Sequence, residues 1–223
     1  TAIVLYDLDR LEERVGALHR AFPEASLHAF AVKACPLPPV LAFLAGLGLG
    51  AEAASLGEIH LALAAGFPPD RIVFDSPAKT LEELRLALGL GLFVNADNMT
   101  ELARLDALAQ AMGLAPRAGL RINPQVGAGR IKATSVAARY SKFGVPLGQR
   151  AAIVEAFGRY PWLVGLHVHV GSQGCSLEQL VAGAGAIDDL AAEIDDRFGQ
   201  GRVAVFDIGG GLPVAYRDED RPP

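Results

Sequence analysis

The sequence predicts a parallel α/β protein, in which short apolar strands alternate with helices along the whole chain. Successive predicted strands are separated by helices rather than by tight hairpin turns, which is the order expected of a parallel sheet. The hydrophobic share of 51%, with 25 glycines, suits strands that are buried on both faces. Helix-capping patterns mark several helix starts, at Ser55–Glu58, Thr80–Glu83, Asn98–Glu101 and Ser176–Gln179.

The first half of the chain opens with a short apolar stretch, Val4–Tyr6, after which Asp7 or Asp9 can cap a helix. The next strand, Ser26–Ala34, is bounded by proline-containing turns on both sides. Helices are expected at Leu11–Ala21, 39–46, Gly57–Ala65 and 81–88, and strands at Gly48–Ala54, Arg71–Asp75 and Leu92–Ala96.

The second half repeats this order, except for a long connection over residues 124–144 that has no clear periodicity. Seven strands, in helix-after-strand order, favour a (β/α)8 TIM-type barrel, with one strand missing, rather than an open doubly wound sheet. No G-x-G-x-x-G motif opens the first helix, which also disfavours the open sheet. Helices are expected at 100–112, 147–158 and 177–197, and strands at Ala118–Ile122, Leu163–Val170 and Arg202–Ile208.

Composition excludes several classes of partner. The formal net charge is −5 and no basic block is present, so nucleic acid is not an expected partner. The uncharged stretch 34–51 is interrupted by prolines and glycines, so it is interpreted as core rather than as a membrane span. Residues 1–20 lack the apolar centre of a signal peptide, and Cys35 and Cys175 form no disulfide framework or metal-ligand spacing. We therefore expect a cytoplasmic protein without a metal site.

Lys33 stands at the carboxyl end of a buried strand, and two interpretations of it are open. In the first, its side chain extends past the end of the strand and its ammonium group lies in water. Alternatively, its amine is desolvated, so that the neutral form can make a Schiff base with an aldehyde.

Other reactive side chains also lie at the carboxyl ends of predicted strands, which in a (β/α)8 barrel form the active-site opening. Glu52 is in an otherwise apolar strand, so its carboxylate needs a partner, either Arg121 or a ligand. His169 is compatible with a hydrogen-bonded core histidine or with a catalytic one. Further members of this set are Asn123, His167 and Asp207.

A triple glycine, Gly209-Gly210-Gly211, follows the last strand, where such barrels commonly hold a phosphate. A flexible turn explains it equally well. Ser172 after the preceding strand can donate a hydroxyl to the same anion, or can be a turn former. An amine for an aldehyde, a phosphate loop and a flat ring to stack together indicate pyridoxal 5′-phosphate (PLP). A phosphosugar aldolase with the same lysine chemistry is the alternative.

Six segments in order resemble the signatures of one family, the fold-type III, alanine racemase-like PLP-dependent decarboxylases of diaminopimelate, ornithine and related amino acids. The resemblance spans almost the whole chain. The segments are Phe30–Ala34 (FAVKA), Gly50–Glu58 (GAEAASLGE), Leu120–Pro124 (LRINP), Ser141–Gly144 (SKFG), His167–Gln173 (HVHVGSQ) and Asp207–Gly211 (DIGGG).

The resemblance implies a role for each matching residue. Lys33 would form the aldimine with PLP and take part in catalysis, and His169 would stack on the pyridine ring. Ser172 and the glycines would hold the phosphate, whereas Glu52 and Arg121 would line the cofactor pocket. Lys142-Phe143-Gly144 match a segment near the subunit interface of dimers, and Gln173 favours the diaminopimelate branch. The implied cofactor-binding set is Lys33, Glu52, Arg121, His169, Ser172, Gly209, Gly210 and Gly211.

The implied activity is decarboxylation of an amino acid, with a diaminopimelate-like or related basic or dicarboxylic substrate, by a homodimer. A racemase on the same scaffold and a non-catalytic regulatory homologue remain alternatives. The family's eighth strand and its C-terminal β-domain have no counterpart in residues 1–223, so we expect one incomplete barrel domain. The sequence does not identify the amino acid.

Overall fold

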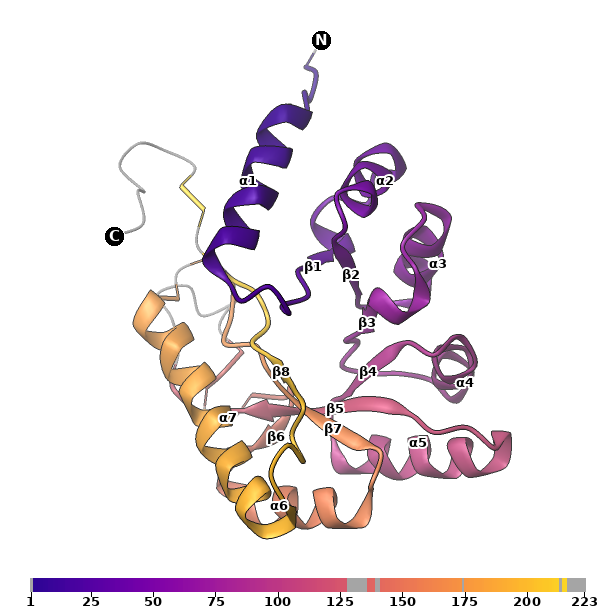
Figure 1. The fold of residues 1–223 in the computed structure, drawn as a ribbon, viewed down its shortest axis with the longest axis vertical. Helices are drawn as coiled ribbons and strands as arrows, with labels where there is room; N and C mark the ends of the chain where they lie inside the picture. The colour runs from indigo at the N-terminus through magenta and orange to yellow at the C-terminus, as the bar shows by residue number, and fades with distance from the viewer. Residues whose placement is uncertain (1, 128–135, 139–140, 174, 213, 216–223) are drawn as a thin grey trace. The chain divides into compact units, whose positions relative to one another are not determined.

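The computed structural model describes residues 2–127, 136–138, 141–173, 175–212 and 214–215. The chain divides into two compact units, Thr1–Val94 and Asn95–Pro223. Within each unit, parallel strands alternate with helices, so the predicted α/β pattern is confirmed (Figure 1).

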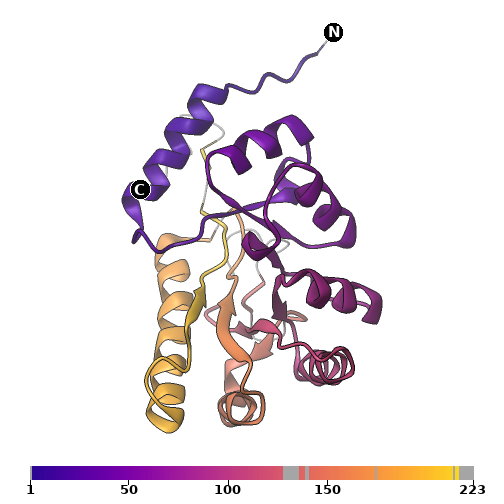
Figure 2. The same cartoon turned by 45° about the vertical axis from the view of Figure 1, so that its right-hand side comes forward.

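The first unit contains four parallel strands, which are neighbours in the order in which they occur along the chain. Helices α2, α3 and α4 lie side by side along these strands (Figures 1 and 2). Leu41, Ile59 and Phe74 are fully buried between these helices and strands. The elements are α1 (Leu8–Ala21), β1 (Ala29–Ala31), α2 (Pro38–Gly46), β2 (Gly50–Ala53), α3 (Leu56–Ala64), β3 (Ile72–Phe74), α4 (Leu81–Leu90) and β4 (Phe93–Ala96), whose last two residues belong to the second unit.

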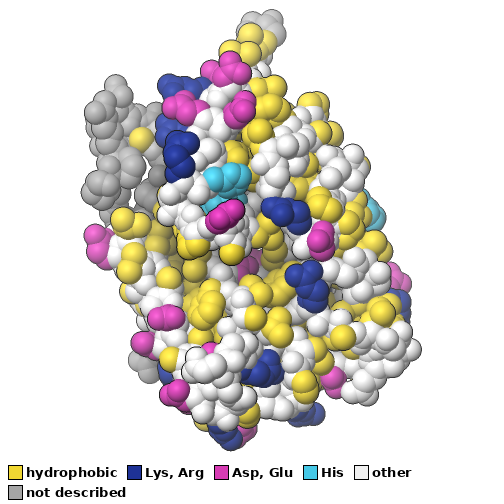
Figure 3. All heavy atoms as spheres, in the orientation of Figure 1, with side chains coloured by type: hydrophobic (Ala, Val, Ile, Leu, Met, Phe, Trp, Pro, Cys, Tyr) yellow, Lys and Arg dark blue, Asp and Glu magenta, His cyan; other side chains and the backbone are white. Residues whose placement is uncertain are grey.

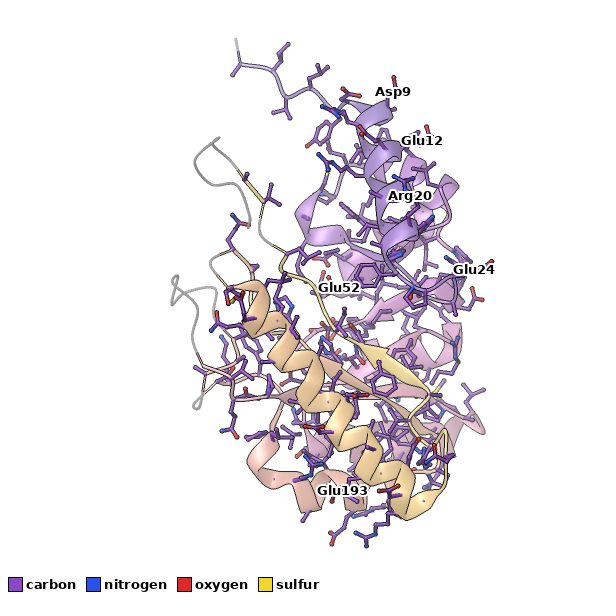
Figure 4. The ribbon with its side chains drawn as sticks, turned by 60° about the vertical axis from the view of Figure 1, so that its left-hand side comes forward. Asp9, Glu12, Arg20, Glu24, Glu52 and Glu193 are labelled. Carbon is purple, nitrogen blue, oxygen red and sulfur yellow. The ribbon has the colours of Figure 1, made fainter. Side chains whose placement is uncertain are left out.

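In the second unit, β7 (Leu163–Val168) lies between β5 (Arg117–Asn123) and β8 (Val205–Asp207), and all three are parallel. The two-residue strand β6 (Val145–Pro146) pairs with the end of β5. Helix α7 (Leu177–Phe198) runs beside β8 in both ribbon views (Figures 1 and 2). It is tied to α6 (Arg150–Arg159) by an ion pair between Arg150 and Glu193, which Figure 4 labels on α7. The remaining helix is α5 (Met99–Met112).

The predicted helix caps are confirmed in full at two helices and in part at two others. Reciprocal capping boxes form at Thr80–Glu83 and Ser176–Gln179. Ser55 and Asn98 also accept the expected backbone hydrogen bonds, but the partner glutamates reach one residue further back. Glu58 accepts from Ala54 N and Glu101 from Asp97 N, both at 2.7 Å. At these two helices the predicted residues form the cap, but each glutamate binds the backbone N–H of the residue before the N-cap.

Several strands are shorter than the sequence predicts. β1 ends at Ala31 because a 3-10 helix, η1 (Val32–Ala34), begins there and carries Lys33. β7 ends at Val168, so His169 lies just beyond the strand. The predicted connection 124–144 falls partly outside the described residues. Among the described residues, no helix is both long and apolar enough to cross a membrane. On the face shown in Figure 3, acidic and basic side chains are interspersed.

Candidate active site

Lys33 and Glu52 form a close ion pair in the first unit. β1 and β2 pair with Ala31 opposite Glu52, so the turn that follows β1 brings the lysine over the end of β2. Lys33 Nζ donates hydrogen bonds to both carboxylate oxygens of Glu52, at 2.9 and 2.7 Å. The Lys33 side chain is 56% exposed and that of Glu52 is 15% exposed, so the hypothesis of a desolvated lysine is not met in this structure. The amine is instead accessible and held by a carboxylate (Figure 4 labels Glu52).

Burial changes the proton affinity of this carboxylate. Desolvation raises the pKa of Glu52 above its usual value, and the negative charges of Asp75 and Glu58 raise it further. The hydrogen bonds and the positive charge of Lys33 act in the opposite direction without cancelling the effect of burial. Glu52 is therefore a carboxylate that takes up a proton more readily than an exposed glutamate.

Arg121 has a different partner from the one expected. In the second unit its guanidinium pairs with Asp97, with 3.5 Å between Nη1 and Oδ1, and it lies 4.9 Å from the centre of the Phe143 ring. Both charged side chains are buried. Of the two partners considered for Glu52, Arg121 or a ligand, Arg121 is not the one observed, because Glu52 pairs with Lys33 and Arg121 pairs with Asp97. Asp97 also accepts a hydrogen bond from Gly144 N, so this pair anchors the 141–144 segment.

The glycine loop after β8 is shaped by two side chains of the second unit. Gly209 N donates to Asp207 Oδ1 at 2.9 Å, and Gly210 N donates to His169 Nδ1 at 3.3 Å. Gly209 and Gly211 have left-handed backbones, with φ of +67° and +102°. Side chains at these two positions would also collide with the backbone of residues 168–172, whereas a Cβ at Gly210 would meet nothing within 4 Å. Gly210 therefore faces open space that a ligand can occupy.

The Ser172 loop lies against the glycine loop. Gln173 joins the two, because its amide donates to Val214 O at 2.9 Å and accepts from Val214 N at 2.7 Å. A Cβ at Gly211 would overlap the carbonyl oxygen of Gly171, which shows how closely the two backbones approach. Ser172 itself is exposed. A serine hydroxyl beside a glycine turn with open space suits a phosphate group, so these residues fit the predicted anion site.

Sequence reasoning missed Asn95, Asp97 and the joining role of Gln173. Asn95 and Asp97 lie in and just after β4, so the rule that selected the ends of other strands could have found them. Their partners become apparent only in the folded chain. Among the described residues, no group of three or more His, Cys, Asp or Glu side chains could hold a metal ion.

A surface cavity of about 410 Å³ lies elsewhere in the first unit. Its lining includes His28, Gly48 and Arg71, which precede β1, β2 and β3 respectively. Lys33 and Glu52 are at the other, carboxyl ends of these strands. Since active sites of parallel barrels form at the carboxyl ends, this cavity is not assigned to the candidate site.

The first unit has an exposed lysine held by a carboxylate at a strand end, and the second has a glycine loop beside a histidine and a serine. These are features expected in the class of α/β proteins that bind an aldehyde cofactor with a phosphate group. The particular family is given by comparison with known proteins. The chain belongs to the family described as "Pyridoxal-dependent decarboxylase, pyridoxal binding domain", whose model matches residues 8–223. The cofactor of this family is PLP, as the sequence predicts.

Relatives of known activity match along almost the whole chain. The chain is 34% identical over 235 residues to the diaminopimelate decarboxylase of Helicobacter pylori, covering 99% of this chain and 55% of that protein. It is 36% identical over 231 residues to the diaminopimelate decarboxylase of Zymomonas mobilis, covering 100% of this chain and 54% of that protein. The chain therefore spans about half the length of the relatives it matches.

Solved structures show the same fold. Diaminopimelate decarboxylase from Helicobacter pylori complexed with L-lysine matches with a TM-score of 0.84 and 31% identity, over 98% of this chain and 57% of that chain. Lysine/ornithine decarboxylase from Vibrio vulnificus, complexed with putrescine, matches with a TM-score of 0.73 and 28% identity, over 94% of this chain and 53% of that chain. The predicted fold class, an α/β barrel of the alanine racemase-like TIM type, is confirmed by these matches.

Proposed function

We propose that the whole protein containing this chain decarboxylates an amino acid with PLP, and that diaminopimelate is the substrate. The observation that carries the proposal is the Lys33–Glu52 pair at the carboxyl ends of β1 and β2, in a chain of the pyridoxal-binding family. The substrate is inferred from relatives that are diaminopimelate decarboxylases, at 34–36% identity. The relative solved with L-lysine supports it, because L-lysine is what remains when diaminopimelate loses one carboxyl group.

Lys33 is assigned to hold the cofactor through its amine. To bond an aldehyde, Nζ must lose a proton, and Glu52 is the acceptor within hydrogen-bond distance. The raised pKa of Glu52 makes that transfer easier than it would be to an exposed glutamate. When its amine is free, Lys33 Nζ would also be the group that returns a proton to the substrate Cα. PLP, when bound, supplies the ring that accepts the electron pair released with carbon dioxide.

The residues of the second unit are assigned to binding and orientation. Ser172 and Gly209–Gly211 hold the phosphate, and His169 packs its ring against the cofactor. The hydrogen bond from Gly210 N to His169 Nδ1 supports this assignment, because it fixes the ring plane and leaves Nε2 as the protonated nitrogen. Arg121 is assigned to the cofactor pocket, where its ion pair with Asp97 keeps the guanidinium in place.

The assembly is part of the same proposal. We place the protein in the cytoplasm as a homodimer, with Lys142-Phe143-Gly144 near the subunit interface. The contact of the Arg121 guanidinium with the Phe143 ring supports a link between the pocket and this segment. No nucleic acid or membrane partner is proposed.

The direct test is an assay of the purified whole protein with PLP and, in turn, diaminopimelate, ornithine, lysine and arginine. We expect carbon dioxide release with diaminopimelate, and loss of turnover in Lys33→Ala. Racemisation of the substrate without carbon dioxide release would instead support a racemase. Binding of PLP without turnover of any amino acid would support a regulatory homologue.

A further inference from the structure

Asn95 and Asp207 form a part-buried hydrogen bond in the second unit that no step of the proposed reaction uses. Asn95 is 1% exposed, and its amide Nδ2 donates to Asp207 Oδ2 at 2.7 Å. Asp207 is the last residue of β8 and pairs in register with His167 of β7. The bond therefore connects the end of β4 with the strand that leads into the glycine loop.

A glycine in β5 makes room for this bond. A Cβ at Gly119 would lie 2.6 Å from Asn95 Oδ1, which is closer than real Cβ contacts. The neighbouring strand offers no alternative space, since the same Cβ would be 3.3 Å from the Gly165 backbone. Gly119 is therefore required for the Asn95 side chain to lie where it does.

The second oxygen of the same carboxylate shapes the glycine loop. Asp207 Oδ1 accepts from Gly209 N at 2.9 Å, at the point where the backbone turns left-handed. Gly210 N is then directed to His169 Nδ1. One carboxylate thus connects the interior amide of Asn95 to the turn of the glycine loop.

We propose that Asp207, held by Asn95, is a positioning residue that presets the glycine loop for the phosphate of PLP. A carboxylate near a phosphate is unfavourable by charge alone, so charge complementarity does not account for an acidic residue here. Its hydrogen bonds with Asn95 Nδ2 and Gly209 N account for it, because an ordered loop loses less conformational entropy when the phosphate binds. This inference rests on the proposed PLP site.

The test compares PLP with pyridoxal, which lacks the phosphate, as ligands of the whole apo-protein. In Asp207→Ala we expect the dissociation constant for PLP to rise by about tenfold, the effect of losing one charge-assisted hydrogen bond. The constant for pyridoxal should stay within about twofold of wild type, since the loop acts on the phosphate alone. Asn95→Ala should shift the PLP constant in the same direction by a smaller factor, and it serves as the second variant if Asp207→Ala fails to fold.

Asp195 provides a matched control. Its carboxylate accepts hydrogen bonds from two backbone N–H groups in the turn before β8, Gly201 N at 2.9 Å and Val203 N at 3.1 Å. Asp195→Ala should lower the melting temperature and leave the PLP-to-pyridoxal ratio unchanged. Equal losses of PLP and pyridoxal affinity in Asp207→Ala, or tighter PLP binding, would overturn the positioning role. A wild-type protein that binds neither ligand would instead reject the proposed function.

Discussion

At the scale of single residues, the candidate chemistry depends on one pair, Lys33 and Glu52. An isolated exposed ion pair contributes little to stability, because water screens both charges. This pair is asymmetric, with an accessible lysine and a glutamate that is mostly withdrawn from water. Burial disfavours the charged form of Glu52, so its pKa in the folded protein is raised. That is a feature expected of a proton acceptor at a functional site rather than of a surface ion pair.

The raised pKa of Glu52 predicts a specific pH dependence of stability. Between the ordinary value of 4.5 and the higher folded value, the native state binds more protons than the unfolded state. The free energy of unfolding contributed by Glu52 therefore decreases as the pH rises through this window. Glutamine does not titrate, so we expect the apo-protein of Glu52→Gln to lose this pH-dependent part of the free energy of unfolding.

Urea unfolding of wild type and Glu52→Gln, measured in steps from the ordinary value of 4.5 upward, checks the prediction. As the pH rises, the free energy of unfolding of wild type should decrease steadily relative to that of Glu52→Gln. Glu83→Gln is the control, because Glu83 belongs to an exposed capping box remote from Lys33 in the sequence. A difference independent of pH in Glu52→Gln would contradict a raised pKa.

At the scale of elements, the turns on the two sides of β8 differ: the turn before it carries a structural arginine, and the loop after it carries candidate phosphate-binding residues. Arg202, ahead of β8, donates to the carbonyl oxygens of Leu163, Phe157 and Tyr160 at 2.5, 2.5 and 2.9 Å. It thereby binds three carbonyls around the α6–β7 junction, one of which, Tyr160 O, also accepts from Leu163 N. The glycine loop after β8 instead leaves open space at Gly210.

The glycine loop can be tested with two neighbouring substitutions. Gly210→Val adds bulk where the chain itself leaves space, so we expect weaker PLP binding with a nearly unchanged melting temperature of the apo-protein. Gly209→Val forces a β-branched residue to a φ of +67° and its Cβ to 2.5 Å from Val168 O, so it should lower the melting temperature. Ligand titration and thermal unfolding of both variants separate the two effects. Equal loss of PLP affinity and stability in Gly210→Val would favour a turn with no ligand.

Much of the fold was predictable because its signals are local. In the described part of the chain, Ser, Thr and Asn caps and proline-bounded apolar runs located every α-helix and seven strands to within a few residues. The two-residue strand β6 has too few residues to show periodicity, and η1 cuts β1 short without a sequence signal. The choice of partners was not predictable. Glu52 selects Lys33 rather than Arg121 because the β1–β2 register places Ala31 opposite Glu52, and register is a property of the folded sheet.

At the scale of the whole molecule, the chain corresponds to about half of its relatives. Lys33 lies in the first compact unit of the chain, and the glycine loop lies in the second. The proposed substrate and dimeric state concern the whole protein. The claim on which all of them depend is that PLP is attached through Lys33.

The most direct measurement of that claim is reduction of the PLP-loaded whole protein with borohydride, followed by proteolysis and mass spectrometry of the peptides. Reduction makes an imine permanent, so the labelled lysine reports where the cofactor was attached. We expect the pyridoxyl group on the peptide that contains Lys33, and no label at this position in Lys33→Ala. Buried Lys79, which donates to Ser76 O at 2.6 Å, is the internal control and should remain unlabelled. Stoichiometric label on another lysine, or no label on a protein that binds PLP, would contradict the account.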